Sequence, residues 1–178
     1  DLQRIFPWET LDSIKEMAYD KFIKIQNAWM NFDYDTLKKE CSDELYNTYY
    51  EQLEVLKLKK QQNIMSDFEI SSIRVVSAEK ENNYCSVVVY LSVAFYDYVI
   101  DSSNNVIQGN KYMMINNHYL LTYIRPIQEE KYTCPNCGAE LNNPYDKRCA
   151  YCRTKINIPM VNEFVLSKKV NERTTRIG

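Results

Sequence analysis

The residues best suited to chemistry are four cysteines in the last third of the chain. Cys134 and Cys137 form one CxxC pair, Cys149 and Cys152 form a second, and eleven residues separate the two pairs. Four thiolates at this spacing are typical of a tetrahedral zinc site, because each tight turn brings two sulfurs together. The sequence therefore predicts one structural Zn²⁺ ion, with no open coordination position for catalysis.

The turns that would carry these sulfurs differ in one residue. Pro135 favours the first turn, and Gly138 supplies the positive φ that follows it. Arg153 holds the equivalent place in the second pair, so either its backbone is strained or that turn differs. The alternative is two disulfides, which would require an oxidising compartment and leave Cys41 and Cys85 as free thiols.

Residues 131–157, which hold the cysteines, are too few to bury a core of their own, so we expect the metal to drive their folding. They contain five basic side chains, two acidic ones and three tyrosines. That composition makes nucleic-acid contact through Lys147, Arg148 and Arg153 one alternative. We favour a structural or docking role, because the chain as a whole carries a formal net charge of −2.

Catalysis is limited by the single histidine, His118, which excludes any mechanism that needs two histidines in one copy. A small pocket enzyme of the isomerase or dehydratase type would have to use His118 with Asp97, next to Tyr98. A hydrogen-bonded strand histidine and a solvated carboxylate are the simpler interpretations. We therefore predict a binding domain without enzymatic activity and keep the pocket enzyme as the alternative.

The first part of the chain has helical periodicity. Apolar residues at spacings of three and four predict a helix over residues 7–32, with Pro7 in its first turn. A short helix follows over residues 33–41. A third begins after Ser42, a favourable N-cap, and ends near residue 60.

Beyond residue 62 the pattern changes to alternation of apolar and polar residues, rich in β-branched types. Four segments are predicted as strands: residues 64–78, 84–100, 111–127 and 161–170. The polar stretch 101–109 predicts the turn of a hairpin. Helices followed by antiparallel strands indicate an α+β fold. The predicted organisation is one α+β domain of residues 1–130 and 158–178, with a zinc ribbon at 131–157 inserted before the last strand.

The order of elements and several diffuse motifs resemble the C-terminal domain of mitochondrial import inner-membrane translocase subunit 44 and its bacterial relatives. The residues that carry the resemblance are Phe22, Gln26, Ala28, Trp29, Asp33, Leu37, the segments 41–45 and 93–101, Gly109, Leu121, Thr122, Tyr123 and Arg125. This family commonly has tryptophan at two places where the present chain has Tyr123 and Phe164. Some bacterial relatives are similar in carrying a ribbon insertion.

The resemblance implies a cone-shaped fold of the nuclear-transport-factor-2-like, cystatin-like kind, in which helices on a curved antiparallel sheet enclose an apolar pocket. We expect Phe22, Trp29, Tyr98 and Tyr123 to line such a pocket. The resemblance also implies a non-enzymatic, membrane-peripheral role, with protein transport as its setting.

The expected partner is a protein, a peptide or a lipid, recognised through the pocket and the zinc ribbon. We expect attachment to the cytoplasmic face of a membrane through a segment upstream of Asp1, in a reducing compartment. No apolar run in the chain reaches the roughly 18 residues that would span a bilayer. Basic residues such as Lys168 and Lys169 are expected on solvated faces, where they would also suit anionic lipid head groups.

Overall fold

The computed structural model describes residues 2–127, 132–143, 146–156 and 164–172. The elements within these ranges are α1 (Leu2–Ile5), α2 (Leu11–Met30), α3 (Tyr34–Glu40), α4 (Asp43–Leu58), β1 (Gln62–Lys80), β2 (Tyr84–Ile100), β3 (Val106–Gly109), β4 (Ile115–Pro126) and β5 (Val165–Asn171). Predictions that concern Lys131, Tyr145, residues 161–163 or the tail from Arg173 lie outside the described residues.

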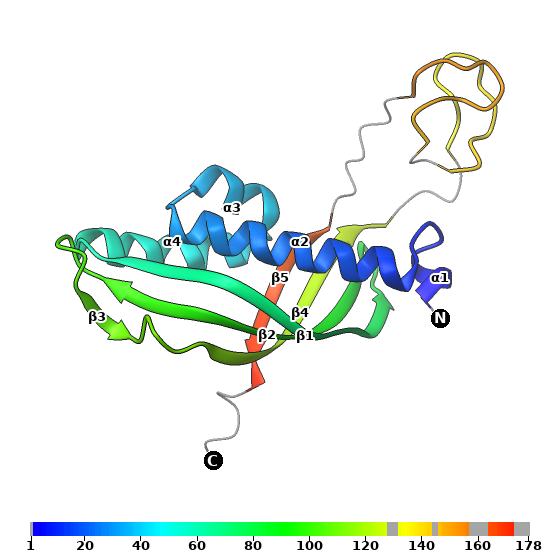
Figure 1. The fold of residues 1–178 in the computed structure, drawn as a ribbon. Helices are drawn as coiled ribbons and strands as arrows, with labels where there is room; N and C mark the ends of the chain where they lie inside the picture. The colour runs from blue at the N-terminus through cyan, green and yellow to red at the C-terminus, as the bar shows by residue number, and fades with distance from the viewer. Residues whose placement is uncertain (1, 128–131, 144–145, 157–163, 173–178) are drawn as a thin grey trace.

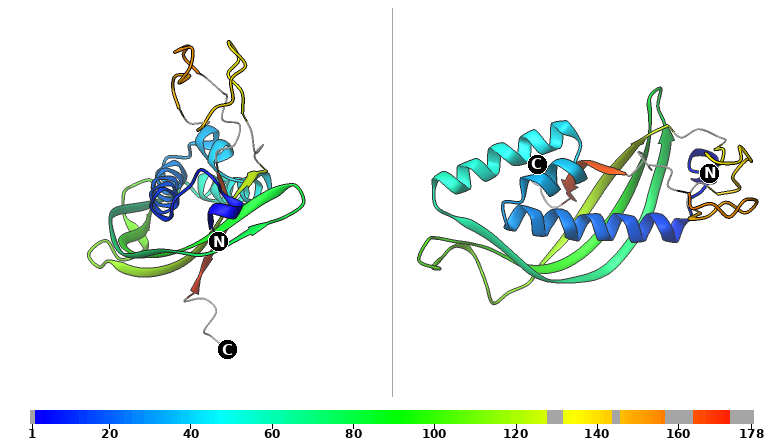
Figure 2. Two further views of the ribbon diagram at one scale, coloured as in Figure 1. Left: turned by 90° about the vertical axis from the view of Figure 1, so that its right-hand side faces the viewer. Right: turned by 90° about the horizontal axis from the view of Figure 1, so that it is seen from above.

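The predicted α+β class is confirmed. The strands form one curved antiparallel sheet in the order β1-β2-β4-β5, and β3 pairs with β2. Helices α2, α3 and α4 lie over one face of this sheet (Figures 1 and 2). The four cysteines lie before the last strand. Among the described residues, no helix is both long and apolar enough to cross a bilayer.

Side-chain caps decide where the helices begin. Asp33 and Ser42 accept hydrogen bonds from the first turns of α3 and α4, as predicted for Ser42. The prediction that the first long helix begins at residue 7 is wrong. Thr10 caps α2 in an extended conformation, and its side chain accepts from the Ser13 N–H while the Ser13 hydroxyl accepts from the Thr10 N–H. Pro7 therefore precedes the helix.

The long hairpin predicted from the sequence is confirmed, because β2 pairs with β4 from Tyr84 opposite Pro126 to Phe95 opposite Ile115. Its connection differs from the prediction. Residues 106–109, expected in the turn, form β3, and residues 111–114, expected in a strand, do not. Gly109 explains the difference: its φ is +79°, and a Cβ there would lie 2.5 Å from the backbone oxygen of Asp97.

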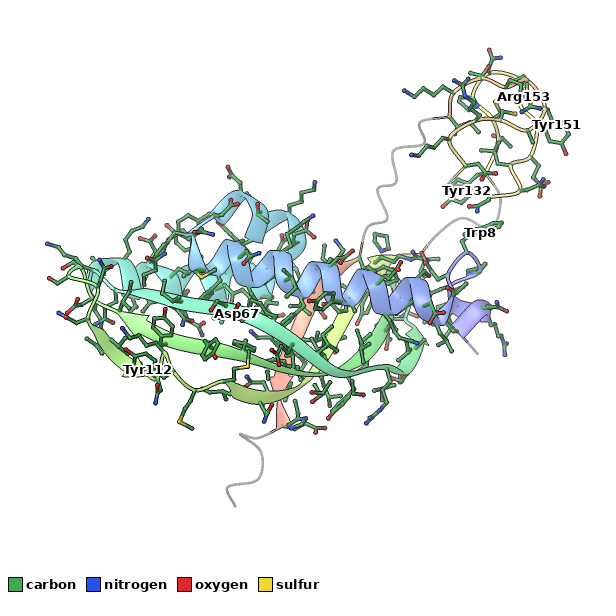
Figure 3. The ribbon with its side chains drawn as sticks, in the orientation of Figure 1. Trp8, Asp67, Tyr112, Tyr132, Tyr151 and Arg153 are labelled. Atoms are coloured by element: carbon green, nitrogen blue, oxygen red, sulfur yellow. The ribbon has the colours of Figure 1, made fainter. Side chains whose placement is uncertain are left out.

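Bulges curve the sheet. Strand β1 contains three register shifts against β2, and at one of them Asp67 adopts a φ of 58° (Figure 3). An extra residue on one strand bends it and increases its twist. The neighbouring Phe68 then packs against Phe22 of α2 and Phe95 of β2. The concave face of the sheet therefore wraps around α2.

The core follows the two-residue period of the strands. In β2 and β4 the odd-numbered residues, from Val87 to Phe95 and from Asn117 to Arg125, are buried, mostly beneath the helices. The Tyr123 hydroxyl donates to the Ala18 carbonyl of α2 at 2.7 Å. These contacts fix the register of the sheet against α2.

One buried cation joins the N-terminal segment to two strands. The Arg125 guanidinium lies over the rings of both Phe6 and Phe164, which contact each other, and donates to the Glu9 carboxylate at 2.9 Å. Only 2% of the Arg125 side chain is exposed. The ion pair is therefore shielded from water. Buried ion pairs of this kind contribute to specificity and are costly to break.

We predict that Arg125→Met lowers the free energy of unfolding by about 3 kcal/mol, because it leaves the Glu9 carboxylate without its guanidinium. Urea denaturation measures the change. Arg74→Met is the matched control, since the exposed Arg74 stacks on Tyr90 at 4.0 Å without a buried carboxylate. We expect the control to cost under about 1 kcal/mol. Equal losses in both variants would contradict the role given to Arg125.

Candidate functional site

The four cysteines predicted as ligands converge on one point. Their sulfur atoms all lie within 4.8 Å of one another. The sulfurs of Cys134 and Cys152 are 3.7 Å apart, and those of Cys137 and Cys149 are 3.8 Å apart. A tetrahedron with metal–sulfur bonds of about 2.3 Å has edges of roughly 3.8 Å, whereas a disulfide bond is only about 2.05 Å long. This arrangement can hold a metal ion.

Two equivalent turns present the sulfurs. The Gly138 N–H donates to the Cys134 carbonyl at 2.9 Å, and the Arg153 N–H donates to the Cys149 carbonyl at 3.0 Å. Gly138 has a φ of 71° and Arg153 a φ of 62°. Of the two alternatives left open by the sequence, the structure has the strained one: the second turn matches the first, and Arg153 adopts the left-handed conformation that favours glycine.

Hydrogen-bond donors surround the sulfurs. The Tyr151 N–H donates to the Cys149 sulfur at 3.4 Å, and the Asn136 amide donates to the Cys152 sulfur at 3.6 Å. Hydrogen bonds from Thr154, and next from Asn136, lower the pKa of the Cys152 thiol. Donors of this kind stabilise thiolates, which is the form that binds a metal.

The cysteine segment has a small core of its own, formed by Cys134, Leu141, Cys149 and Ile156. Its described basic residues are exposed on the outside, as is Tyr151 with 68% of its surface accessible (Figure 3). The Arg148 guanidinium donates to the Arg153 carbonyl at 3.2 Å. Contact with nucleic acid through these basic residues stays a prediction.

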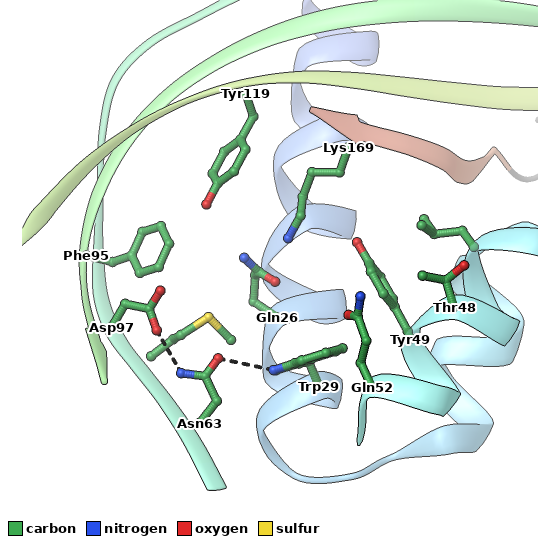
Figure 4. A pocket seen from close by; sticks show the side chains of 12 residues that line it. Gln26, Trp29, Thr48, Tyr49, Gln52, Asn63, Phe95, Asp97, Tyr119 and Lys169 are labelled. Carbon is green, nitrogen blue, oxygen red and sulfur yellow. Dashed lines mark hydrogen bonds between the residues drawn. The ribbon is translucent and has the colours of Figure 1, made fainter. Parts of the chain in front are cut away.

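A pocket of about 400 Å³ lies between helices α2 and α4 and the concave face of the sheet. Its lining residues are Gln26, Trp29, Leu45, Thr48, Tyr49, Gln52, Asn63, Met65, Phe95, Asp97, Tyr119 and Lys169 (Figure 4). The volume falls within the range of roughly 300–1,000 Å³ that is usual for small-ligand sites. Aromatic walls with a few polar groups are also typical of such sites.

On one side of the pocket, a chain of hydrogen bonds connects the polar side chains. The Trp29 indole N–H donates to the Asn63 side-chain oxygen at 3.2 Å, and the Asn63 amide donates to the Asp97 carboxylate at 2.7 Å. The same amide also donates to the Tyr98 carbonyl at 3.0 Å. The Asp97 carboxylate is therefore held by a neutral donor at the pocket wall.

On the other side, polar groups have no such partners among the described residues. The Lys169 ammonium lies over the rings of Tyr119 and Tyr49, at 5.3 Å and 5.8 Å from their centroids. Removal from water lowers the pKa of Lys169 to about 8, while attraction to Asp97 acts in the opposite direction. Burial raises the pKa of the Tyr49 and Tyr119 hydroxyls, so both stay protonated donors.

The structure places the four predicted pocket residues differently. Trp29 lines the pocket. Phe22 and Tyr123, exposed by 1% and 0%, belong to the core between α2 and the sheet. Tyr98 is half-buried and lies outside the pocket lining, although its carbonyl accepts from Asn63.

His118 and Asp97, the residues of the alternative pocket enzyme, are not brought together. Asp97 lines the pocket, whereas His118 occupies an even position of β4 opposite Ser92 and faces the other side of the sheet. The His118 Nδ1 lies 2.8 Å from the Tyr90 hydroxyl, as expected for a hydrogen-bonded strand histidine. No acid–base pair forms from these two residues.

Lys169, expected on a solvated face, lines the pocket instead. A bulge in β5 causes this difference. Thr122 pairs with Lys168 and Tyr123 pairs with Leu166, so Ser167 is an extra residue in β5. The extra residue turns Lys169 toward the helices, and an unbroken alternation would have placed Lys168 there.

Comparison with known proteins separates the helices and the first four strands from the cysteine segment. The family model described as the Tim44-like domain matches residues 10–133, which contain α2–α4 and β1–β4. The match ends just before Cys134, so the cysteine cluster lies after the matched range. No curated protein matches the chain. The family resemblance seen in the sequence is confirmed.

We predict that Arg153→Gly raises the metal affinity about fivefold, because it removes roughly 1 kcal/mol of left-handed strain. Gly138→Ala should lower the affinity by a similar factor through the backbone alone, since a Cβ at Gly138 meets nothing within 4 Å. Competition with a chromophoric zinc chelator measures both changes. Arg153→Ala removes the same guanidinium but keeps the strain, and a gain there equal to that of Arg153→Gly would contradict the strain argument.

Proposed function

The chain belongs to the Tim44-like domain family, and on this basis we propose that it is a non-enzymatic binding domain that recognises its partner through the pocket and the cysteine segment. Family membership indicates a membrane-associated role in protein transport. The observation that carries the finer proposal is the pocket itself, because it combines aromatic walls with polar groups that lack partners among the described residues.

The occupant of the pocket is a protein segment, a peptide or a lipid. Trp29 and Phe95 offer apolar surface in the pocket, and Met65 of β1 adds an adaptable apolar side chain to the same lining. A pocket of about 400 Å³ accepts one apolar side chain with its neighbours, or one chain of a lipid. Binding there requires no chemical change in the occupant.

The cysteine segment, residues 131–157, is proposed as a zinc ribbon inserted into the α+β domain formed by residues 1–130 and 158–178. Four sulfurs at tetrahedral spacing support Zn²⁺ as the ion, since this ion favours closed thiolate sites. None of the six cysteines, all within the described residues, forms a disulfide, which supports a reducing compartment such as the cytoplasmic face of a membrane. The ribbon then provides a second, rigid contact surface, and attachment to the membrane would come from a segment upstream of Asp1.

We predict that Cys134→Ser abolishes stoichiometric zinc and unfolds the ribbon but leaves the α+β domain folded, because the two have separate hydrophobic cores. Elemental analysis reports the zinc, and the main thermal unfolding transition reports the domain. The matched control is Cys85→Ser, which changes a buried cysteine outside the cluster. Retention of one zinc per chain in Cys134→Ser would contradict the four-thiolate site.

We predict that the neutral, apolar dye Nile red binds the full chain at one saturable site and that Thr48→Trp abolishes this binding. Thr48 is an exposed residue of α4 at the pocket, so a large side chain there blocks entry without disturbing the core. Dye fluorescence measures the affinity. Asn47→Trp adds the same ring one position away, outside the pocket lining, and should bind dye normally.

The two tryptophan variants make the outcome decisive. Loss of dye binding in Thr48→Trp alone supports recognition through the pocket. Absence of saturable binding to the wild-type chain, or equal binding by both variants, would overturn the proposed function.

A further inference from the structure

Resting on the proposed function, we propose that the pocket recognises a monocarboxylate with an apolar chain, whose carboxylate is bound by Lys169 and Tyr49. The ligand class deepens the assignment of the same pocket. It follows from four observations on the polar end of the pocket.

The first observation is the bulge in β5. The extra residue Ser167 is held by a hydrogen bond from its hydroxyl to the Thr122 carbonyl at 3.2 Å. As a result Lys169, and not the exposed Lys168, faces the pocket. Bulges that redirect one side chain are frequent next to functional sites. Holding a lysine side chain inside a pocket lined by aromatic rings is costly without a ligand.

The second observation is the surroundings of the ammonium. Among the described residues, no carboxylate lies within 4 Å of the Lys169 nitrogen, although the chain forms five such pairs elsewhere in these ranges. Its contacts are the faces of the Tyr49 and Tyr119 rings. At neutral pH a lysine with a pKa of about 8 is mostly charged. The pocket therefore offers a cation to an anion that enters it.

The third observation is a buried hydroxyl. Of the buried side-chain nitrogen and oxygen atoms in the described ranges, the Tyr49 hydroxyl is the one without a hydrogen-bond partner. Tyr49 is 8% exposed and lies on α4, across the pocket from β5. In Figure 4 the Tyr49 hydroxyl, the Lys169 ammonium and the Gln26 amide point toward the same part of the pocket. A buried polar atom without a partner destabilises the fold, and a bound acceptor would remove that cost.

The fourth observation limits the charge of the ligand. Asp97 lines the same pocket and attracts the Lys169 ammonium, so the two charges balance locally. One oxygen of Asp97 already accepts from Asn63 at 2.7 Å. A dianionic phosphate would meet one lysine together with this carboxylate and be repelled. A carboxylate carries a single charge and needs only the few donors that Lys169 and Tyr49 supply.

The apolar part of the ligand is accommodated by the remaining walls. Trp29 packs edge-to-face on Tyr49 with ring centroids 5.3 Å apart, so the apolar wall begins directly beside the hydroxyl. Phe95 and Met65 continue it on the sheet side. A chain attached to the carboxylate therefore leaves the polar end along an apolar surface.

The test is calorimetric titration of the full, metal-loaded chain with decanoate, compared with decanol, which has the same chain and no charge. We expect decanoate to bind at least 10-fold more tightly than decanol. Lys169→Met should weaken decanoate binding at least 10-fold and leave decanol binding unchanged or stronger. Tyr49→Phe should weaken decanoate binding about fivefold, since it removes only the hydroxyl.

Two variants serve as matched controls. Lys168→Met removes the neighbouring exposed charge, and Tyr50→Phe removes a hydroxyl from an exposed tyrosine of the same helix. Neither should change decanoate binding. Nile red binding and the thermal unfolding transition verify that each variant is folded with an open pocket.

The outcomes separate this inference from the proposed function. If Nile red binds through the pocket but decanoate and decanol bind equally, the monocarboxylate inference is wrong and the pocket proposal stands. The inference is also overturned if Lys168→Met matches Lys169→Met, or if decyl phosphate binds more tightly than decanoate. If Nile red itself fails to bind the wild-type chain, the proposed function fails first.

Discussion

The two-residue alternation of the strands, and the bulges that shift it, decide which strand side chains reach the pocket. Odd positions of β2 and β4 face the helices, so Asp97 and Tyr119 reach the pocket while His118 faces the opposite side. The bulge in β5 reverses this alternation for the last strand and brings Lys169 to the same pocket. Because a shift of one residue moves a whole side-chain set to the other face, the register of pairing decides which lysine of β5 faces the pocket.

The pocket and the core lie on the same face of the sheet, the face that the helices cover. Near Tyr123 the face is filled completely, with the tyrosine hydroxyl donating to α2. Near Lys169 the face instead carries a cation, and among the described residues the Tyr49 hydroxyl of α4 beside it is buried without a partner. Uncompensated polar groups of this kind destabilise a folded domain and cluster at functional sites, where a ligand provides the missing interaction. The cysteine segment is separate from both, because its four-residue core is distinct from the core beneath the helices.

Local signals in the sequence predict most of the fold and the convergence of the four cysteines, whereas the pocket depends on non-local contacts. Ser42 as an N-cap, the full extent of β2 and the convergence of Cys134 with its partners follow from spacing alone. The start of α2 was misplaced because Pro7 and Thr10 are both good helix-start residues, and the capping box selected the second. Of the pocket residues the sequence predicts only Trp29, and Asp97 as part of the alternative enzyme, since neither the bulge at Ser167 nor the convergence of α4 with β5 leaves a periodic pattern in the chain.

The central claim is that a lysine ammonium is held inside a ligand pocket, and the pKa of Lys169 tests it most directly. Nuclear magnetic resonance of the lysine side-chain nitrogens in the full chain, titrated with pH, gives this value once Lys169→Met has assigned the signal. Desolvation predicts a pKa of about 8, and added decanoate should raise it because the carboxylate stabilises the charged form. A pKa near the ordinary lysine value of about 10.4, unchanged by decanoate, would place the ammonium in water and contradict the account.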